Sequence, residues 1–123
     1  MTIISHLPAV VADCIGAADL GGSYRLDFVG SSRAATASEV LNAAKAECIA
    51  SINAECRARL IARYGPAEEQ VSRAIGVYGA QEQSDMQAGI AATIDASNVA
   101  QNAILAAADL AAVEAVTVTW PVI

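Results

Sequence analysis

The chain has 123 residues and a mass of 12.5 kDa, which is the size of one domain. Its hydrophobic fraction is 55% and its aromatic fraction only 4%, because roughly a quarter of the residues are alanine, which favours helix but buries little apolar area. Seven basic and 13 acidic residues give a net charge of −6 without a broad basic surface, so we expect no nucleic-acid partner.

Residues 1–35 predict an irregular arm with one short strand. Pro8 disfavours an early helix, and residues 10–18 fit either a short helix or an extended arm. Residues 24–28 alternate apolar and polar side chains, which is the period of a half-buried strand. Turn-forming glycine and serine residues precede and follow this strand, at 21–23 and 30–32.

The clearest element is a helix over residues 37–64. Thr36 and Glu39 have the spacing of a capping box, in which each side chain satisfies a backbone N–H of the other residue. Gly65 occupies the usual position just after a helix, and Pro66 cannot continue one. Both ends of this helix are therefore marked in the sequence.

A second helix is predicted over residues 67–78 and a third over residues 85–115. Ser84 and Gln87 have capping-box spacing at the start of the third helix, and no proline interrupts the stretch that follows. The sequence therefore predicts a mainly α fold, a helical bundle or helical hairpin with one long C-terminal helix. Residues 36–115 would form this helical domain.

The long predicted helix carries a seam of the coiled-coil type, in which one side chain every three or four residues faces a partner helix. Ser97 and Gln101 interrupt the seam, and such polar layers fix the register between helices. We expect the seam to pack against copies of the chain or another protein. Its members are Met86, Ile90, Ile94, Ser97, Gln101, Ile104, Ala108 and Ala111.

Residues 116–123 predict a C-terminal strand. Val116, Val118 and Trp120 alternate with Thr117 and Thr119, and the following proline suits an edge strand or a chain end. The strand could pair with residues 24–28 or with a partner's sheet. Trp120 is the last interface candidate, either capping its own core or anchoring in a neighbour.

No residue pattern predicts catalysis, a cofactor or a metal site. His6 is the only histidine, so one chain cannot supply a His-rich metal site, and Cys14, Cys48 and Cys56 form no CxxC motif. Cys48 and Cys56 fit small buried side chains, or alternatively an interchain disulfide. No segment has the features of a signal peptide or of a bilayer-spanning helix, so we expect no membrane insertion and no enzymatic activity.

Two stretches resemble small tail-region proteins of bacteriophages and prophages. The first is residues 52–61 (INAECRARLI) with 75–79 (IGVYG), and the second is 96–100 (ASNVA) running on to 109–121 (DLAAVEAVTVTWP). Together they span about residues 50–121. The pattern is similar to helical segments that accompany tail fibres.

The resemblance implies a structural component of the phage tail, associated with the tail fibre or baseplate. Such a protein is made in the host cytoplasm, is located in the virion, and acts by helical oligomerisation and docking. We expect a homo-oligomer that is three-fold itself or docks on a trimeric fibre. One alternative is a tail-fibre assembly chaperone that does not stay in the virion. A further alternative, a small enzyme or ligand-binding domain, would need a polar constellation for which the sequence offers no candidate.

Overall fold

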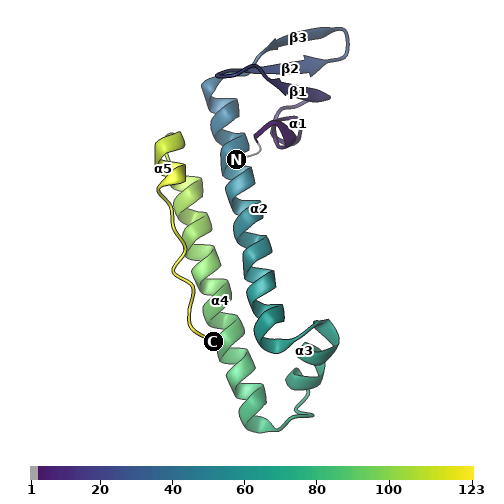
Figure 1. Ribbon diagram of the computed structural model, residues 1–123, viewed down its shortest axis with the longest axis vertical. Coiled ribbons are helices and arrows are strands. Elements are labelled where there is room, and N and C mark those ends of the chain that lie inside the picture. Colours follow the sequence, from purple (N-terminus) through teal and green to yellow (C-terminus); the bar gives the residue numbers. More distant parts are fainter. Residues whose placement is uncertain (1–2) are drawn as a thin grey trace. The chain divides into compact units, whose positions relative to one another are not determined.

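The computed structural model describes residues 3–123 and is mostly helical, with one small antiparallel sheet, which confirms the mainly α prediction (Figure 1). The three strands are consecutive along the chain and pair in the order β1-β2-β3. The elements are the 3-10 turn η1 (Ile3–Ser5), α1 (Leu7–Val10), β1 (Gly16–Asp19), β2 (Tyr24–Phe28), β3 (Ser31–Ala34), α2 (Ala37–Tyr64), α3 (Ala67–Ala74), α4 (Ala80–Ala106) and α5 (Leu110–Glu114).

The described chain forms two compact units that cut across the chain order. Unit 1 comprises residues up to 50 together with residues 104–115, and unit 2 comprises residues 51–103 together with residues 116–123. The helices α2 and α4 each contribute to both units. Each unit therefore has its own packing and is described separately.

The core of unit 1 lies between the sheet, the N-terminal turns and the first half of α2. Leu7 of α1 and Leu26 of β2 are fully buried there, against Ala43 and Ala44 of α2. The alanines let the other elements approach the α2 backbone closely. Lys45 donates a hydrogen bond of 2.9 Å to the carbonyl of Leu105, which satisfies a free acceptor at the C-terminal end of α4 within this unit.

The sheet contains the predicted strand Tyr24–Phe28 and two strands that the sequence did not predict. β2 pairs on one side with β1, where Ala17 faces Leu26, and on the other with β3, where Leu26 faces Arg33. Neither outer strand has a clear apolar alternation, and all four residues of β3 are exposed. Their order comes from hydrogen bonds to β2 and from the predicted turns, where Gly21, Gly22 and Gly30 have positive φ. The first two residues of the predicted arm lie outside the described residues.

Helix α2 begins and ends where the sequence predicted. The Glu39 amide donates to the Thr36 hydroxyl at 3.2 Å, and the Thr36 amide donates to the Glu39 carboxylate at 2.9 Å, which confirms the capping box. Gly65 follows the helix with φ 83°, and its amide donates to the carbonyl of Ile61. Both local signals therefore determine the ends of this helix.

Helix α3 is shorter than the predicted 67–78. It ends at Ala74, because the chain turns at Gly76 and Gly79, whose φ values of 85° and 101° leave the helical region. The side-chain amide of Gln83 then donates to the carbonyl of Ala74 at 2.6 Å, which satisfies one of the free acceptors at the helix end.

The predicted helix over residues 85–115 was wrong at both ends. α4 begins at Ala80, directly after Gly79, so Ser84 lies inside the helix and the predicted capping box does not form. α4 ends at Ala106, because Asp109 begins a separate helix by accepting a hydrogen bond of 2.8 Å from the amide of Ala112. The single long helix is therefore two helices, α4 and α5.

The predicted strand over residues 116–120 is absent. The segment has the expected alternation, with Val116, Val118 and Trp120 half-buried and both threonines exposed. It belongs to unit 2, where helices and not strands surround it, and a helix has no free backbone groups along its length to pair with a strand. The alternation therefore predicted which side chains of the segment are half-buried and which are exposed, but it did not predict that the segment lies against helices instead of pairing with a strand.

We predict that Asp109→Ala lets α4 continue into residues 107–109. The substitution removes the cap of α5, which costs about 1 kcal/mol, and leaves a run of alanines that favours helix. Backbone chemical shifts of residues 105–114 would report the change, and thermal unfolding would report the cost. Asp109→Asn keeps a capping side chain and should retain the break between the helices. Loss of the break in both variants would contradict the role of this cap.

Candidate functional site

The buried stripe of α4 in unit 2 consists mainly of small residues. Met86 is large, but Gly89, Thr93, Ser97 and Ala100 follow it toward the end of the unit. This stripe is rotated from the predicted seam, which followed the large apolar residues instead. Among the predicted interface residues, Met86, Ser97 and Ile104 are buried within the chain, Ile90, Gln101 and Trp120 are half-buried, and Ile94, Ala108 and Ala111 are exposed.

A polar layer connects α4 to α2 at the position where the sequence placed a break in the seam. The side-chain amide of Gln101 donates to the Asn53 side-chain oxygen and to the Ser97 hydroxyl, both at 2.8 Å. A shift of one helix against the other would leave these groups without partners, which is costly for a partly buried amide. The layer therefore fixes the register of the two helices within one chain.

A close approach between α2 and α4 occurs at Tyr64 and Gly89. Tyr64 is 2% exposed, and its hydroxyl donates to the carbonyl of Asp85 at 3.4 Å. A Cβ atom at Gly89 would overlap this hydroxyl and lie 2.8 Å from the ring carbon that carries it. The glycine in the helix interior is thus explained by the ring that covers it.

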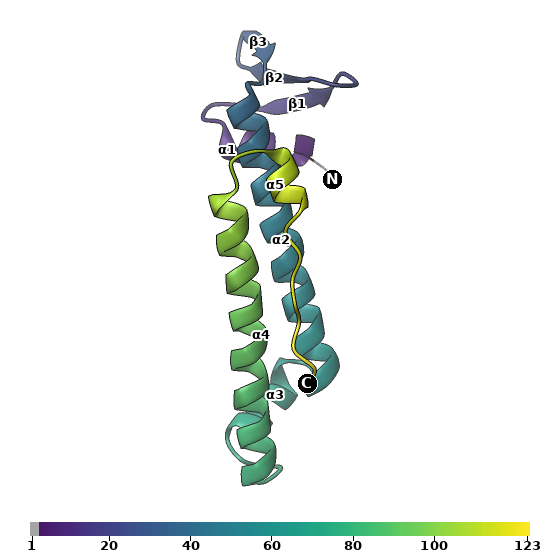
Figure 2. The ribbon, with the colours of Figure 1, turned by 90° about the vertical axis from the view of Figure 1, so that its left-hand side faces the viewer.

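The C-terminal segment (residues 116–123) belongs to unit 2, where it runs beside α4 in Figure 1 and over α2 in Figure 2, and residues of both helices line the pockets next to it. Its main side-chain contact is Trp120, whose ring centre is 4.9 Å from the guanidinium carbon of Arg59. Glu55 accepts hydrogen bonds of 3.1 and 2.8 Å from Arg59 and so holds the guanidinium in place. The sequence carries no marker of this pairing, so Arg59 was not predicted as the partner of Trp120.

Apolar side chains are exposed together around the end of α3, and we name this set the apolar turn. None of α3 is buried in the described chain, although its apolar residues have helical spacing. Apolar residues at this spacing usually form the buried face of a helix. The members are Val71, Ile75, Val77 and Tyr78, which are 60, 72, 65 and 54% exposed.

Polar contacts rather than a core hold the apolar turn in unit 2. Arg73 stacks on Tyr78 at 5.0 Å, forms an ion pair with Glu82, and donates to the carbonyl of Tyr64 at 3.2 Å. The side-chain amide of Gln70 donates to the carbonyl of Gly65 at 2.9 Å. The turn is thus tied to the helix ends by its polar side chains while its apolar side chains face outward.

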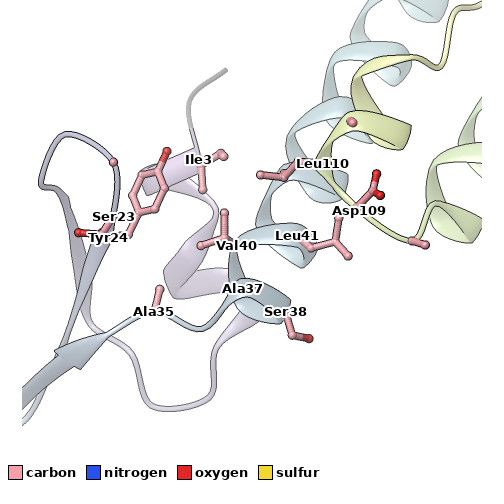
Figure 3. Close-up of a pocket in the computed structure, with 13 residues that line it drawn as sticks. Ile3, Ser23, Tyr24, Ala35, Ala37, Ser38, Val40, Leu41, Asp109 and Leu110 are labelled. Atoms are coloured by element: carbon pink, nitrogen blue, oxygen red, sulfur yellow. The ribbon is translucent and has the colours of Figure 1, made fainter.

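Unit 1 contains an open groove of about 980 Å³ between the start of α2, the sheet and α5. Figure 3 shows Ile3, Val40 and Leu110 directed toward the same space. Asp109 is the one carboxylate among the lining residues, and it already caps α5. The groove is therefore mainly apolar and lacks a group placed for acid–base chemistry.

The histidine and one of the cysteines have structural partners. His6 lies 2.5 Å from the Glu47 carboxylate, and the Cys14 thiol donates to the carbonyl of Gly16 at 3.1 Å. Burial, followed by the charges of Glu47 and Glu114, raises the pKa of the Cys48 thiol. A raised pKa disfavours the thiolate, which is the reactive form. Over residues 3–123 all three cysteines are free, and no group of three or more His, Cys, Asp or Glu side chains could hold a metal ion.

Within residues 3–123, the strongest electrostatic perturbation lies at the start of α2. Arg33 donates two hydrogen bonds of 2.7 Å to the Glu39 carboxylate, and the backbone of Thr36 donates a third. These contacts, with Arg33 contributing most, lower the pKa of Glu39 from 4.5 to about 2. The pair connects β3 to α2 within unit 1.

None of the described helices combines the length and the apolar character needed to cross a membrane. Comparison of the chain with protein-family models, with characterised proteins and with solved structures gives no match.

We predict that Gly89→Ala destabilises the protein by about 1–3 kcal/mol through overpacking against Tyr64. The sign of the stability change is diagnostic, because replacing glycine by alanine at an unobstructed helix position would instead stabilise the protein by about 1 kcal/mol. In a Tyr64→Ala background the overlap is absent, so Gly89→Ala should become stabilising. Urea unfolding of the four proteins measures this coupling, and equal effects of Gly89→Ala in both backgrounds would contradict the close approach.

We predict that Arg33→Ala raises the pKa of Glu39 toward 4.5, as measured by NMR titration of the carboxyl carbon. A carboxyl group whose pKa is lowered by folding stabilises the folded state at pH values above its pKa in the unfolded chain. This stabilisation is lost as the pH falls through its pKa in the folded protein. Wild type should therefore be more stable than Arg33→Ala at neutral pH, and the difference should vanish near pH 2. Arg25→Ala, which removes a different exposed ion pair, should leave the Glu39 pKa unchanged.

Proposed function

We propose that this protein is a structural component of a bacteriophage tail, associated with the tail fibre or baseplate and acting through self-association and docking. The assignment to phage tails is supported by the resemblance of residues 50–121 to small tail-region proteins. The assignment to assembly is supported by the apolar turn, because an exposed apolar set of this kind is typical of an interaction surface.

The composition of the core supports an assembly role for the same reason. The buried side chains of unit 2 are few, and three of them, Thr93, Ser97 and Ala100, are small, so they remove little apolar area from water. Larger apolar side chains such as Ile61 and Val122 are instead 45 and 102% exposed. Association with copies or partners would bury area that the single chain leaves in water.

A tail-fibre assembly chaperone, absent from the finished virion, is the second candidate function. The apolar turn favours it too, because such a surface could cover apolar parts of an unassembled fibre. Protein quantification in purified virions separates the two functions. A structural component is present in stoichiometric amounts, whereas a departing chaperone is absent or far below them.

A small ligand-binding or enzymatic domain is the weakest candidate. The groove in unit 1 is large enough for a small molecule, but its lining is mainly apolar and its carboxylate is engaged. Thermal-shift screening with apolar compounds tests this candidate directly.

We predict that the wild-type protein is an oligomer at micromolar concentration and that Ile75→Asp weakens association about tenfold or more. A carboxylate in the centre of an apolar contact must be desolvated, which costs at least 1–2 kcal/mol. Multi-angle light scattering across a dilution series measures the effect.

Val99→Asp is the matched control, since Val99 is similarly exposed but lies outside the apolar turn. An unchanged mass in Ile75→Asp would exclude the apolar turn as the contact. A wild-type protein that is a stable monomer and binds no fibre or baseplate protein would contradict the proposed function.

A further inference from the structure

Side chains alone hold the C-terminal segment in unit 2. Within the described chain, no backbone N–H or C=O of residues 116–123 forms a hydrogen bond. The stack of Trp120 on Arg59 and the half-buried Val116 and Val118 provide its contacts. Because no hydrogen-bond ladder has to be broken, this segment can leave and re-enter its position more easily than a paired strand could.

The position that receives the segment is formed by α2 and α4, and we name it the segment site. Arg59, Ala62 and Arg63 line it from α2, and Ala88 and Ala92 line it from α4. The alanines leave room for Pro121 and Ile123, while Arg59 provides a flat cation for an aromatic ring. The lining therefore suits a short apolar peptide that carries an aromatic residue.

The chain reaches the segment site through a junction that no regular element stiffens. It passes between the two units at three points, and two of these lie inside the continuous helices α2 and α4. The third lies between Ala115, which caps α5 in unit 1, and Val116, which begins the segment in unit 2. A change of backbone angles at this junction would redirect the segment without disturbing a helix or strand.

We propose that copies of this protein exchange their C-terminal segments, so that residues 116–123 of one copy occupy the segment site of a second copy. The occupant is fixed by the structure, because the second copy's segment would make the same contacts that the chain's own segment makes. Exchange of an identical segment is a low-cost route to an oligomer, since it needs no new complementary surface. This inference rests on the self-association in the proposed function and identifies one contact that would link the copies.

The test uses the single tryptophan of the chain as a reporter. Arg59→Ala keeps Trp120 but removes its stacking partner, so its emission should shift to the red and iodide should quench it more strongly. Trp120→Ala has an intact Arg59 and no tryptophan signal of its own. The two proteins are mixed at a concentration at which light scattering shows association.

Exchange predicts that the Trp120 emission shifts to the blue on mixing, because Trp120 of the Arg59→Ala variant stacks on Arg59 of the Trp120→Ala variant. The shift should saturate near an equimolar ratio of the two proteins. The matched control is the double variant Arg59→Ala/Trp120→Ala, which is equally silent but lacks the guanidinium and should give no shift. No shift with either protein would overturn the exchange. Circular dichroism checks that the variants fold, and Arg59→Gln replaces Arg59→Ala if it does not.

The same experiment distinguishes the exchange from the proposed function. Association of the wild-type protein without a spectral shift overturns segment exchange and leaves self-assembly intact. A wild-type protein that remains monomeric at every concentration overturns both. A shift that is equal for the double variant also overturns the exchange, because the recovered emission would not depend on Arg59.

Discussion

The small side chains that α4 presents toward α2 are the constraint on which unit 2 depends. Gly89, Thr93, Ser97 and Ala100 present little more than backbone, so Tyr64 can lie directly on the helix surface at Gly89. The consequence is a pair of closely packed helices that buries little apolar area. Apart from Ile52, Tyr64 and Met86, the larger apolar side chains of the unit are half-buried or exposed, and those of the apolar turn lie in water. The packing that stabilises the unit and the surface that could recruit a partner thus have a common origin.

Polar groups compensate for the small core by fixing geometry. The Gln101 amide joins Asn53 and Ser97 across the helix pair, and Arg73 joins the end of α2 to the apolar turn. In unit 1, Lys45 performs a similar role at the end of α4. Each contact contributes little net free energy because water competes for the same groups, but each would be lost in an alternative register. Register and turn geometry are therefore specified mainly by hydrogen bonds.

Sequence reasoning succeeded where the determinants were local. Thr36, Glu39 and Gly65 fixed both ends of α2 without reference to the rest of the chain, and the alternation of residues 24–28 gave β2. β1 and β3 escaped prediction because their order depends on hydrogen bonds to β2 rather than on their own side chains. The length of the last helix was overestimated because Asp109 lies in a helix-favouring run of alanines, and its capping role depends on the chain bending there.

The candidate surfaces were predicted less well, for a physical reason. Large apolar residues were expected to be buried, so Ile90 and Ile94 were assigned to the packing seam, whereas the helices meet through smaller residues. Ser97 and Gln101 form a polar layer within one chain, and its partner Asn53 lies 48 residues from Gln101 and carries no marker in the sequence. The stack of Trp120 on Arg59 is equally remote. Contacts of this range require the fold itself.

The division of the chain between the two units has a consequence for the order of events during synthesis. The sheet is a local meander of consecutive strands, so it can form as soon as its own residues are available. Neither unit is complete at that stage, because unit 1 needs residues 104–115 and unit 2 needs residues 116–123. In a nascent chain, helix α2 therefore lacks some of its packing partners until residues 104–115 and 116–123 have both left the ribosome. In that interval its exposed helix face is open to chaperones and to other nascent chains.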